Sequence, residues 1–263
     1  MASPTSLFQS LAIQRRVLYA LLMREIITRF GRKNLGVLWV FVEPMIFTLG
    51  VAALWMGAGF HHGSSIPIVA FAITGYSSVL LWRNCANQSM GAIASNLGLL
   101  YHRNVRVIDV FLIRSVIEMT GATTSFAVLS LLLIGMGWMQ PPVDTLTVIV
   151  GWLMLAWFGT VLAMLIGAGT AYSHLVEKLW PPASYLLFPL SGAAYMVEWL
   201  PTQVQQYVLL LPMVHGIEIL REGFFGHAVR THYNMGYMAT CCLVLTLAAL
   251  YMVREAGLHV ETQ

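Results

Sequence analysis

The stretch Thr145–Gly169, TLTVIVGWLMLAWFGTVLAMLIGAG, decides the fold because it contains no charged residue. A helix rises about 1.5 Å per residue, so roughly 20 apolar residues cross the hydrocarbon core of a bilayer. A helix also satisfies its own backbone hydrogen bonds, which lipid requires. The stretch therefore predicts a transmembrane helix.

The whole 263-residue chain has the same character. It is 58% hydrophobic and 10% charged, with a mean hydropathy of +0.75. Soluble domains carry about 25% charged residues, so this composition excludes a soluble globule. Disorder needs low hydrophobicity, and three cysteines are too few for a disulfide scaffold. The composition indicates a polytopic membrane protein.

Five further apolar runs are long enough to be spans, and no strand-like alternation competes with them. In one of these runs Pro181-Pro182 is expected in the first helical turn, where missing N–H groups cost least. We predict an all-helical membrane domain over residues 35–263, preceded by a head of residues 1–34. The six expected spans are about 35–58, 66–82, 108–136, 145–169, 180–197 and 233–253.

Basic residues are divided unequally between the two expected faces. Only Arg221 and Arg230, of 14 Lys and Arg residues, fall on one side, which leaves 14 − 2 = 12 on the other. The positive-inside rule then predicts that both termini are cytoplasmic. The first 34 residues show no secretory signal-peptide pattern, so we expect none.

The head carries polar and apolar residues at helical period. Ile26, Ile27 and Phe30 lie opposite a polar face, which predicts a helix in the cytoplasmic interface with its arginines at the level of the lipid phosphates. We hypothesise that this face also receives an anionic, lipid-linked substrate; the alternative is a plain positively charged anchor. The candidate residues for this substrate entrance are Arg24, Arg29, Arg32 and Lys33.

The second-to-third connection, residues 83–106, is rich in Asn, Ser and basic residues. Ser89–Leu100 predicts a short helix with a polar face, which is suited to docking into a groove on a partner protein. The alternative is an ordinary connecting helix.

Glu198–His232 is too apolar for a free loop and too short and polar to span. We predict two short helices that enter the membrane from the outer side and are broken near Pro212; the alternative is a surface amphipathic hairpin. His215, Glu218 and Glu222 share one helical face, but Arg221 lies beside both glutamates as an ion-pair partner. We therefore expect no metal site and a structural role for this cluster.

Two charged features fall inside predicted spans. Glu43 is followed by Pro44, which is expected to kink the helix. An intramembrane carboxylate indicates a functional site, and pairing with an arginine at a subunit contact is the equal alternative. Arg114 and Glu118 stand at i, i+4 and are expected to neutralise each other.

Aromatic side chains supply the other candidate channel residues, because their faces let sugar rings slide past without obligatory hydrogen bonds. Simple packing is the alternative for each of them. The candidate channel-lining residues are Trp39, Glu43, Tyr76, Tyr185 and Tyr195.

The sequence contains no phosphate-binding loop of the form G-x-x-x-x-G-K-[ST], and its only lysines are Lys33 and Lys178. No nucleophile or paired-carboxylate motif is visible. We expect a chain that is not an enzyme, binds no cofactor or nucleic acid, and takes its energy from a partner ATPase.

Three stretches give the chain a family resemblance. They are Leu22–Phe30 with Leu35–Pro44, Asn96–Arg114, and Pro189–Gly192 with Leu200–Gly223. The chain resembles the membrane subunit of ABC-2 type exporters, and most of all the inner-membrane permease of Gram-negative capsular polysaccharide exporters.

The resemblance implies a homodimer in the bacterial inner membrane with two separate ABC ATPase subunits that hold ATP and Mg²⁺. It implies lipid-linked capsule polymer as cargo, a periplasmic adaptor of the co-polymerase type, and an outer-membrane polysaccharide export protein. It places a coupling helix within residues 89–106 and a periplasmic gate in residues 198–232. The coupling residues would be Asn96, Tyr101, His102, Arg103 and Arg106, and the gate residues Pro212, His215, Glu218, Arg221 and Glu222.

Three other readings remain open. The same machinery could carry O-antigen, teichoic acid, or another lipid or drug. The chain could instead be a membrane-embedded glycosyl- or acyltransferase, or a proton-driven carrier.

Overall fold

A computed structural model describes residues 7–31, 35–58, 66–100 and 105–261. Every regular element in these ranges is a helix, which confirms the all-helical prediction. Single turns of 3-10 helix occur at Val197–Trp199 and Gly226–Ala228. The α-helices are α1 Leu7–Phe30, α2 Leu35–Gly57, α3 Ile68–Ser89, α4 Ala92–Ser95, α5 Leu97–Leu100, α6 Val107–Gly135, α7 Thr145–Tyr172, α8 His174–Leu190, α9 Thr202–Val208, α10 Pro212–Phe225 and α11 Met235–Glu261.

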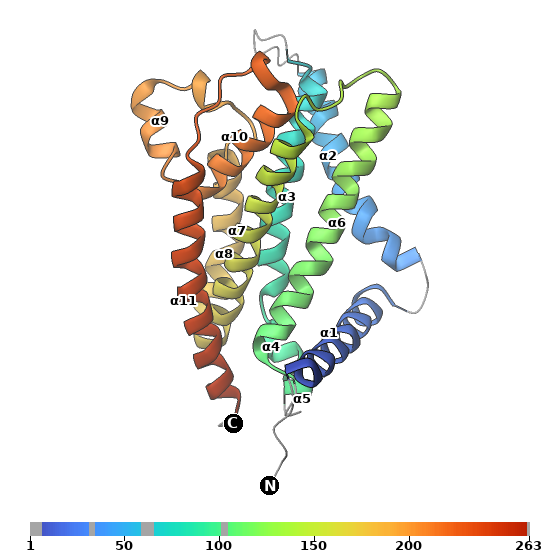
Figure 1. Ribbon diagram of the computed structural model, residues 1–263, viewed down its shortest axis with the longest axis vertical. Coiled ribbons are helices and arrows are strands. Elements are labelled where there is room, and N and C mark those ends of the chain that lie inside the picture. The colour runs from blue at the N-terminus through green and yellow to red at the C-terminus, as the bar shows by residue number, and fades with distance from the viewer. Residues whose placement is uncertain (1–6, 32–34, 59–65, 101–104, 262–263) are drawn as a thin grey trace.

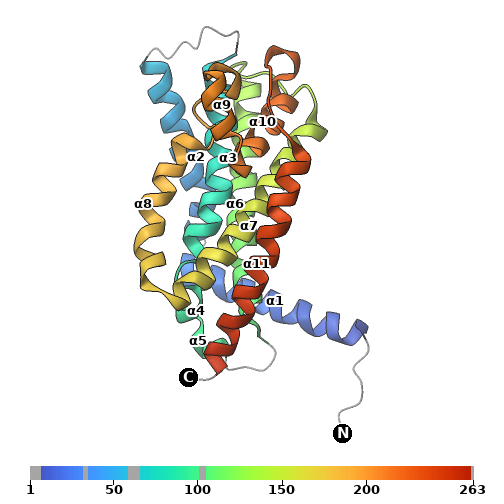
Figure 2. The same ribbon diagram turned by 90° about the vertical axis from the view of Figure 1, so that its left-hand side faces the viewer.

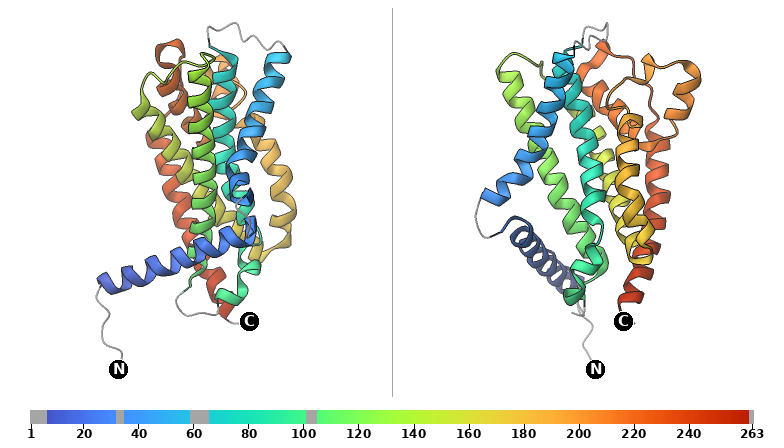
Figure 3. Two further views of the ribbon diagram at one scale, coloured as in Figure 1. Left: turned by 90° about the vertical axis from the view of Figure 1, so that its right-hand side faces the viewer. Right: turned by 180° about the vertical axis from the view of Figure 1, so that it is seen from behind.

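Six long helices, α2, α3, α6, α7, α8 and α11, run side by side as a bundle (Figures 1 and 2). The helix α1 crosses one end of the bundle, as both views of Figure 3 show, and α4 and α5 lie at the same end. The helices α9 and α10 lie at the opposite end. The last turns of α11 end beside α4 and α5, so the first and last helices share one end of the bundle.

The charge-free helix α7 is the centre of the bundle and packs against α3, α10 and α11. Its small residues allow this close packing. A Cβ atom on Gly159 would lie 2.8 Å from the Cα of Trp82 in α3, and one on Gly151 would lie 2.7 Å from the backbone N of Leu220 in α10. Glycine is therefore required where α7 meets each of these neighbours.

Within the described ranges, four helices are long and apolar enough to cross a membrane: α2 over Leu38–Gly57, α6, α7, and α11 over Met235–Leu258. These match four of the six expected spans. The other two expected spans correspond to α3 and α8, which lie in the same bundle but fall short of that criterion. The last turns of α3 contain Arg83, Asn84, Asn87 and Gln88, and α8 has only 17 residues with three prolines.

The expected bounds of the fifth span were wrong. The helix α8 begins at His174, because the hydroxyl of Ser173 accepts a hydrogen bond from the backbone N–H of Leu175 and caps the N-terminus. Pro181-Pro182 therefore lies inside α8 and not in its first turn. The helix ends at Leu190, and the chain turns at Gly192, whose φ of 86° favours glycine.

The helix α2 bends at its lower half, as Figure 1 shows, and Pro44 lies inside it. Proline removes one backbone donor and clashes with the preceding turn, which explains the bend. The hydroxyl of Ser125 on α6 donates a 2.6 Å hydrogen bond to the carbonyl of Phe41, so α6 contacts α2 beside the bend.

The helix α1 is held to the bundle through α6. Leu21 is buried and packs with Ile113 and Ile117 of α6. Glu25 is buried on the same side, whereas Ile27 is 53% exposed. The charged residues of α1 therefore face the protein as well as its surroundings, which the simple two-face expectation for the head did not include.

Candidate functional site

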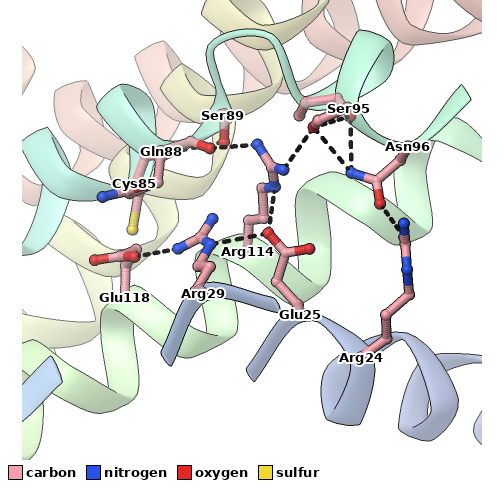
Figure 4. Close-up of polar contacts among 11 residues, drawn as sticks. Arg24, Glu25, Arg29, Cys85, Gln88, Ser89, Ser95, Asn96, Arg114 and Glu118 are labelled. Carbon is pink, nitrogen blue, oxygen red and sulfur yellow. Dashed lines mark hydrogen bonds and ion pairs between the residues drawn. The ribbon is translucent and has the colours of Figure 1, made fainter. Parts of the chain in front are cut away.

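Charged side chains of α1 and α6 meet in a buried network at the α1 end of the bundle (Figure 4). Glu25 lies at its centre: one carboxylate oxygen is 2.8 Å from Nε of Arg114 and 2.9 Å from Nε of Arg29. The Arg29 guanidinium also donates to the carboxylate of Glu118 at 2.7 Å. The network therefore alternates positive and negative charges, as groups removed from water require.

The expected pair Arg114–Glu118 is wrong. Although the two residues are one turn apart on α6, their partners come from α1: Arg114 pairs with Glu25 and Glu118 with Arg29. An i, i+4 spacing makes a pair possible but does not choose it over a partner on a neighbouring helix.

Arg114 also joins two further elements. Its guanidinium donates to the backbone carbonyl of Gln88 at the end of α3, at 2.8 Å, and to the hydroxyl of Ser95 in α4, at 2.9 Å. One side chain thus fixes α1, α3 and α4 relative to α6.

The predicted coupling segment forms two single-turn helices, α4 and α5, and not one continuous helix, while Ser89 belongs to α3. Asn96 lies between them and is buried. Its carboxamide oxygen accepts a hydrogen bond from Arg24 of α1, and its nitrogen donates to the carbonyl of Ala92 at 2.9 Å. The segment is therefore bonded to the interface helix.

Other predicted coupling and entrance residues divide into two groups. Arg106 is exposed and is the N-cap residue of α6, where its backbone N–H donates to the carboxylate of Asp109 at 3.0 Å. The remaining ones lie outside the described residues: Tyr101, His102, Arg103, Arg32 and Lys33.

A cavity of about 510 Å³ lies beside the network, lined by residues of α1, α2, α3, α6 and α8. Three predicted channel residues, Glu43, Tyr76 and Tyr185, line it, together with the predicted entrance residue Arg29. Two others do not: Trp39 is 55% exposed on α2, and Tyr195 donates its hydroxyl to the carbonyl of Leu190 in the turn after α8. The structure thus brings together residues from three predicted spans and the head.

The cavity also contains polar residues that no motif identified. Arg83, Asn84, Asn87 and Gln88 line its wall from the last turns of α3. The guanidinium carbon of Arg83 lies 4.2 Å from the ring centroid of Tyr185, a cation–π contact between α3 and α8. The sequence signal was this cluster of polar side chains at helical spacing directly after an apolar run, which we interpreted as a connection.

At the opposite end, Arg221 of α10 is fully buried. It donates to the backbone carbonyls of Gly192, Ala193 and Tyr195 at 2.6 to 2.7 Å, and its guanidinium carbon is 3.8 Å from the centroid of Phe71. The expected ion pairs of Arg221 with Glu218 and Glu222 are wrong, because its donors are directed at the turn that follows α8.

The two short helices expected in residues 198–232 are present as α9 and α10, and Pro212 is the first residue of α10. His215 bonds through Nε2 to the carbonyl of Leu209 at 2.8 Å, and its Nδ1 accepts from the backbone N–H of Asn234 at 3.0 Å. Both ring nitrogens therefore form hydrogen bonds, and His215 links α10 to the residue just before α11.

The two glutamates of the predicted gate also bond to backbone and hydroxyl groups. The Glu218 carboxylate accepts from the N–H groups of Val197 and His232, and Glu222 accepts from the hydroxyl of Thr231. Within the described part of the chain, no group of three or more His, Cys, Asp or Glu residues is arranged to hold a metal ion.

In the 3-10 turn before α9, Glu198 bonds to the ring of His232 and lies 4.0 Å from Arg230. The hydrogen bond from His232 holds the pKa of the Glu198 carboxyl below its ordinary value, and the two positive neighbours add to this effect. This contact joins the turn before α9 to the segment that leads into α11.

Comparison with known proteins gives consistent matches. Residues 16–225 match the ABC-2 type transporter family. The chain is 45% identical to the capsule polysaccharide export inner-membrane protein CtrC of Neisseria meningitidis serogroup B, over 98% of both chains. It is 41% identical to the capsule polysaccharide export inner-membrane protein BexB of Haemophilus influenzae, again over 98% of both. It is 27% identical to the polysialic acid transport protein KpsM of Escherichia coli, over 94% of this chain and 96% of that one.

Proposed function

The chain belongs to the ABC-2 type transporter family, and on this basis we propose that it is the membrane-spanning permease subunit of an ATP-driven exporter of lipid-linked capsular polysaccharide. The observation that carries the proposal is the similarity over 98% of the chain to proteins named as capsule polysaccharide export inner-membrane proteins.

In this proposal the energy comes from a separate subunit. The sequence has no phosphate-binding loop, so ATP and Mg²⁺ bind to two copies of a partner ATPase. Those subunits dock against residues 89–106 at the α1 end, which is the cytoplasmic end with both termini. The hydrogen bonds of Ser95 and Asn96 to Arg114 and Arg24 support a role in passing motion into the bundle.

Two copies of the chain form the exporter, each with six spans made of α2, α3, α6, α7, α8 and α11. The polymer enters beside α1 and passes the cavity between α2, α3 and α8, which contains the aromatic and carboxamide groups that suit sugars. The helices α9 and α10 form a re-entrant gate at the periplasmic end, with Arg221 as its internal support. A periplasmic adaptor and an outer-membrane export protein continue the path.

The test is deletion of the gene in its native host, followed by complementation. We expect loss of surface capsule, accumulation of polymer in the cytoplasm, and restoration by the wild-type chain. Unchanged capsule, or loss of O-antigen or teichoic acid in its place, would overturn the choice of cargo.

The partner is tested by affinity purification of the chain from native membranes. A subunit with ATPase activity is expected in a 1:1 ratio to the permease. If purified permease alone, reconstituted in vesicles, transports polymer along a proton gradient, the ATP-driven mechanism is wrong.

A further inference from the structure

The two arginines of the cavity differ in how far their charges are compensated. Arg29 donates through Nε to Glu25 and through Nη1 to Glu118. Arg83 has no carboxylate within 4 Å among the described residues and contacts the face of Tyr185. A cation in a largely protein-lined cavity without a carboxylate in contact with it favours an anion from outside.

The same two arginines also retain donors that no described residue accepts from. Nε of Arg83 and Nη2 of Arg29 are both buried and have no hydrogen-bond partner in the described part of the chain. A buried donor without a partner loses the hydrogen bonds that it made in water, so a ligand that accepts from it is stabilised. Guanidinium groups match the planar geometry of carboxylate and phosphate groups.

The carboxamides around Arg83 add a second kind of contact. Asn84, Asn87 and Gln88 line the wall next to it, and Tyr76 faces the same cavity. Carboxamides both donate to and accept from hydroxyl groups, and an aromatic ring packs against the apolar face of a sugar. A volume of about 510 Å³ lies within the range of ordinary ligand pockets of about 300–1,000 Å³.

We propose that Arg83, held by its stacking on Tyr185 and assisted by Arg29, binds the anionic group of an acidic sugar unit in this cavity. The inference rests on the proposed function and narrows it: the cargo segment that occupies the cavity bears a carboxylate or a phosphate. Glu43 also lines this cavity and forms no ion pair with any described residue. Its negative charge repels anions, so an anion is favoured only next to Arg83.

Direct binding tests this site without requiring export. The wild-type chain in lipid nanodiscs is titrated by calorimetry with tetragalacturonate, glucose 1-phosphate and neutral maltotetraose. We expect the two anionic probes to bind more tightly than maltotetraose, with an affinity that falls as salt is raised. The relative affinities of the carboxylate and phosphate probes identify which anion the site prefers.

Three variants assign the effect to the residue. Arg83→Gln should weaken binding of the preferred anion about tenfold or more while maltotetraose binding is unchanged, because a charged hydrogen bond is lost. Arg83→Lys should be intermediate, because it keeps the charge and loses the planar face. Arg254→Gln, which removes an exposed arginine at the end of α11, is the matched control and should bind as the wild type does.

Equal affinity of the wild type for charged and neutral probes, no binding of any probe, or unchanged anion binding by Arg83→Gln would each overturn the proposal. If Arg83→Gln does not fold, the same affinities are measured for Arg83→Lys and Tyr185→Ala, which should bind the anionic probe more weakly and maltotetraose as the wild type does. A chain that binds the acidic probe by Arg83 but whose deletion leaves capsule intact would retain this site and refute the proposed function.

Discussion

Nε of Arg114 lies 2.8 Å from Oε1 of Glu25, and the two side chains are only 10% and 9% exposed. This contact joins α6 to α1, the helix that crosses the end of the bundle. Two ion pairs therefore hold α1 to α6: Arg114 with Glu25, and Arg29 with Glu118. The contact between Glu25 and Arg29 within α1 links the two pairs.

Removing either member of this pair should destabilise the protein. Arg114→Met leaves Glu25 with one cation, and Glu25→Gln leaves Arg114 without its carboxylate; a broken buried pair costs about 3 kcal/mol or more. The double variant should be more stable than the sum of the single effects predicts. Thermal unfolding in detergent measures all three, and additive losses would mean that the pair makes no direct contribution.

The positions of the long apolar helices were predictable because a helix that crosses lipid needs a long uncharged run. The uncharged run Thr145–Gly169 became α7, and Val107 begins α6 one residue before the expected start near Ile108. The start of α8 was missed because Pro181-Pro182 indicated a helix start. The structure has both prolines inside the helix, and the true start is the local cap that Ser173 provides.

Which residues share a site was harder to predict, since it depends on neighbours far apart in sequence. Arg29 and Glu118 are 89 positions apart, and Arg221 and Gly192 are 29 apart. Charge spacing on one helix suggested the pairs Arg114–Glu118 and Arg221–Glu218. In the structure both arginines bind instead to groups from other segments, which come close only when the bundle is packed. The sequence predicted some of the residues that line the cavity, namely Glu43, Tyr76 and Tyr185, but it did not single out Arg83.

Arg221→Met should destabilise the protein more than most single changes. It leaves the backbone carbonyls of Gly192, Ala193 and Tyr195 without a charged donor, which predicts a loss of about 3 kcal/mol. Thermal unfolding of purified protein gives the value. Arg230→Met is the control: its side chain is 87% exposed, so a change within about 0.5 kcal/mol is expected. Similar losses in both variants would contradict the structural role of Arg221.

Gly151→Ala should weaken the contact between α7 and α10. The new Cβ would lie 2.7 Å from the backbone N of Leu220 and 3.0 Å from the carbonyl oxygen of Gly216, and backbone atoms cannot yield without moving a helix. A loss of about 1–3 kcal/mol is expected from unfolding measurements. Gly50→Ala in α2 is the matched control, because no atom of another described element lies within 4 Å of its new Cβ, and it should be neutral or slightly stabilising.

Glu43→Gln tests whether this carboxylate is functional or structural. Because Glu43 is exposed on α2 and forms no ion pair with any described residue, stability should change by less than about 0.5 kcal/mol. Removing its negative charge from the cavity should increase tetragalacturonate affinity by a factor of about 3 to 10 and leave maltotetraose affinity unchanged. Glu177→Gln, on α8 outside the cavity lining, should change neither affinity, and a large stability loss in Glu43→Gln would instead indicate a structural pair.

Acid should release the contact between Glu198 and His232. The pKa of Glu198 is lowered in the folded protein, first by the hydrogen bond from His232 and then by the nearby positive charges. A carboxyl group of this kind contributes stability above its unfolded pKa of about 4.3, and that contribution is lost as pH falls through the lower folded pKa. The melting temperature of the wild type should therefore exceed that of Glu198→Gln at pH 6, and the difference should shrink as pH falls below about 4.3 and vanish below the folded pKa. His232→Ala removes the donor and should give the same convergence, whereas a difference that persists at low pH would show that Glu198 acts by packing and not by its charge.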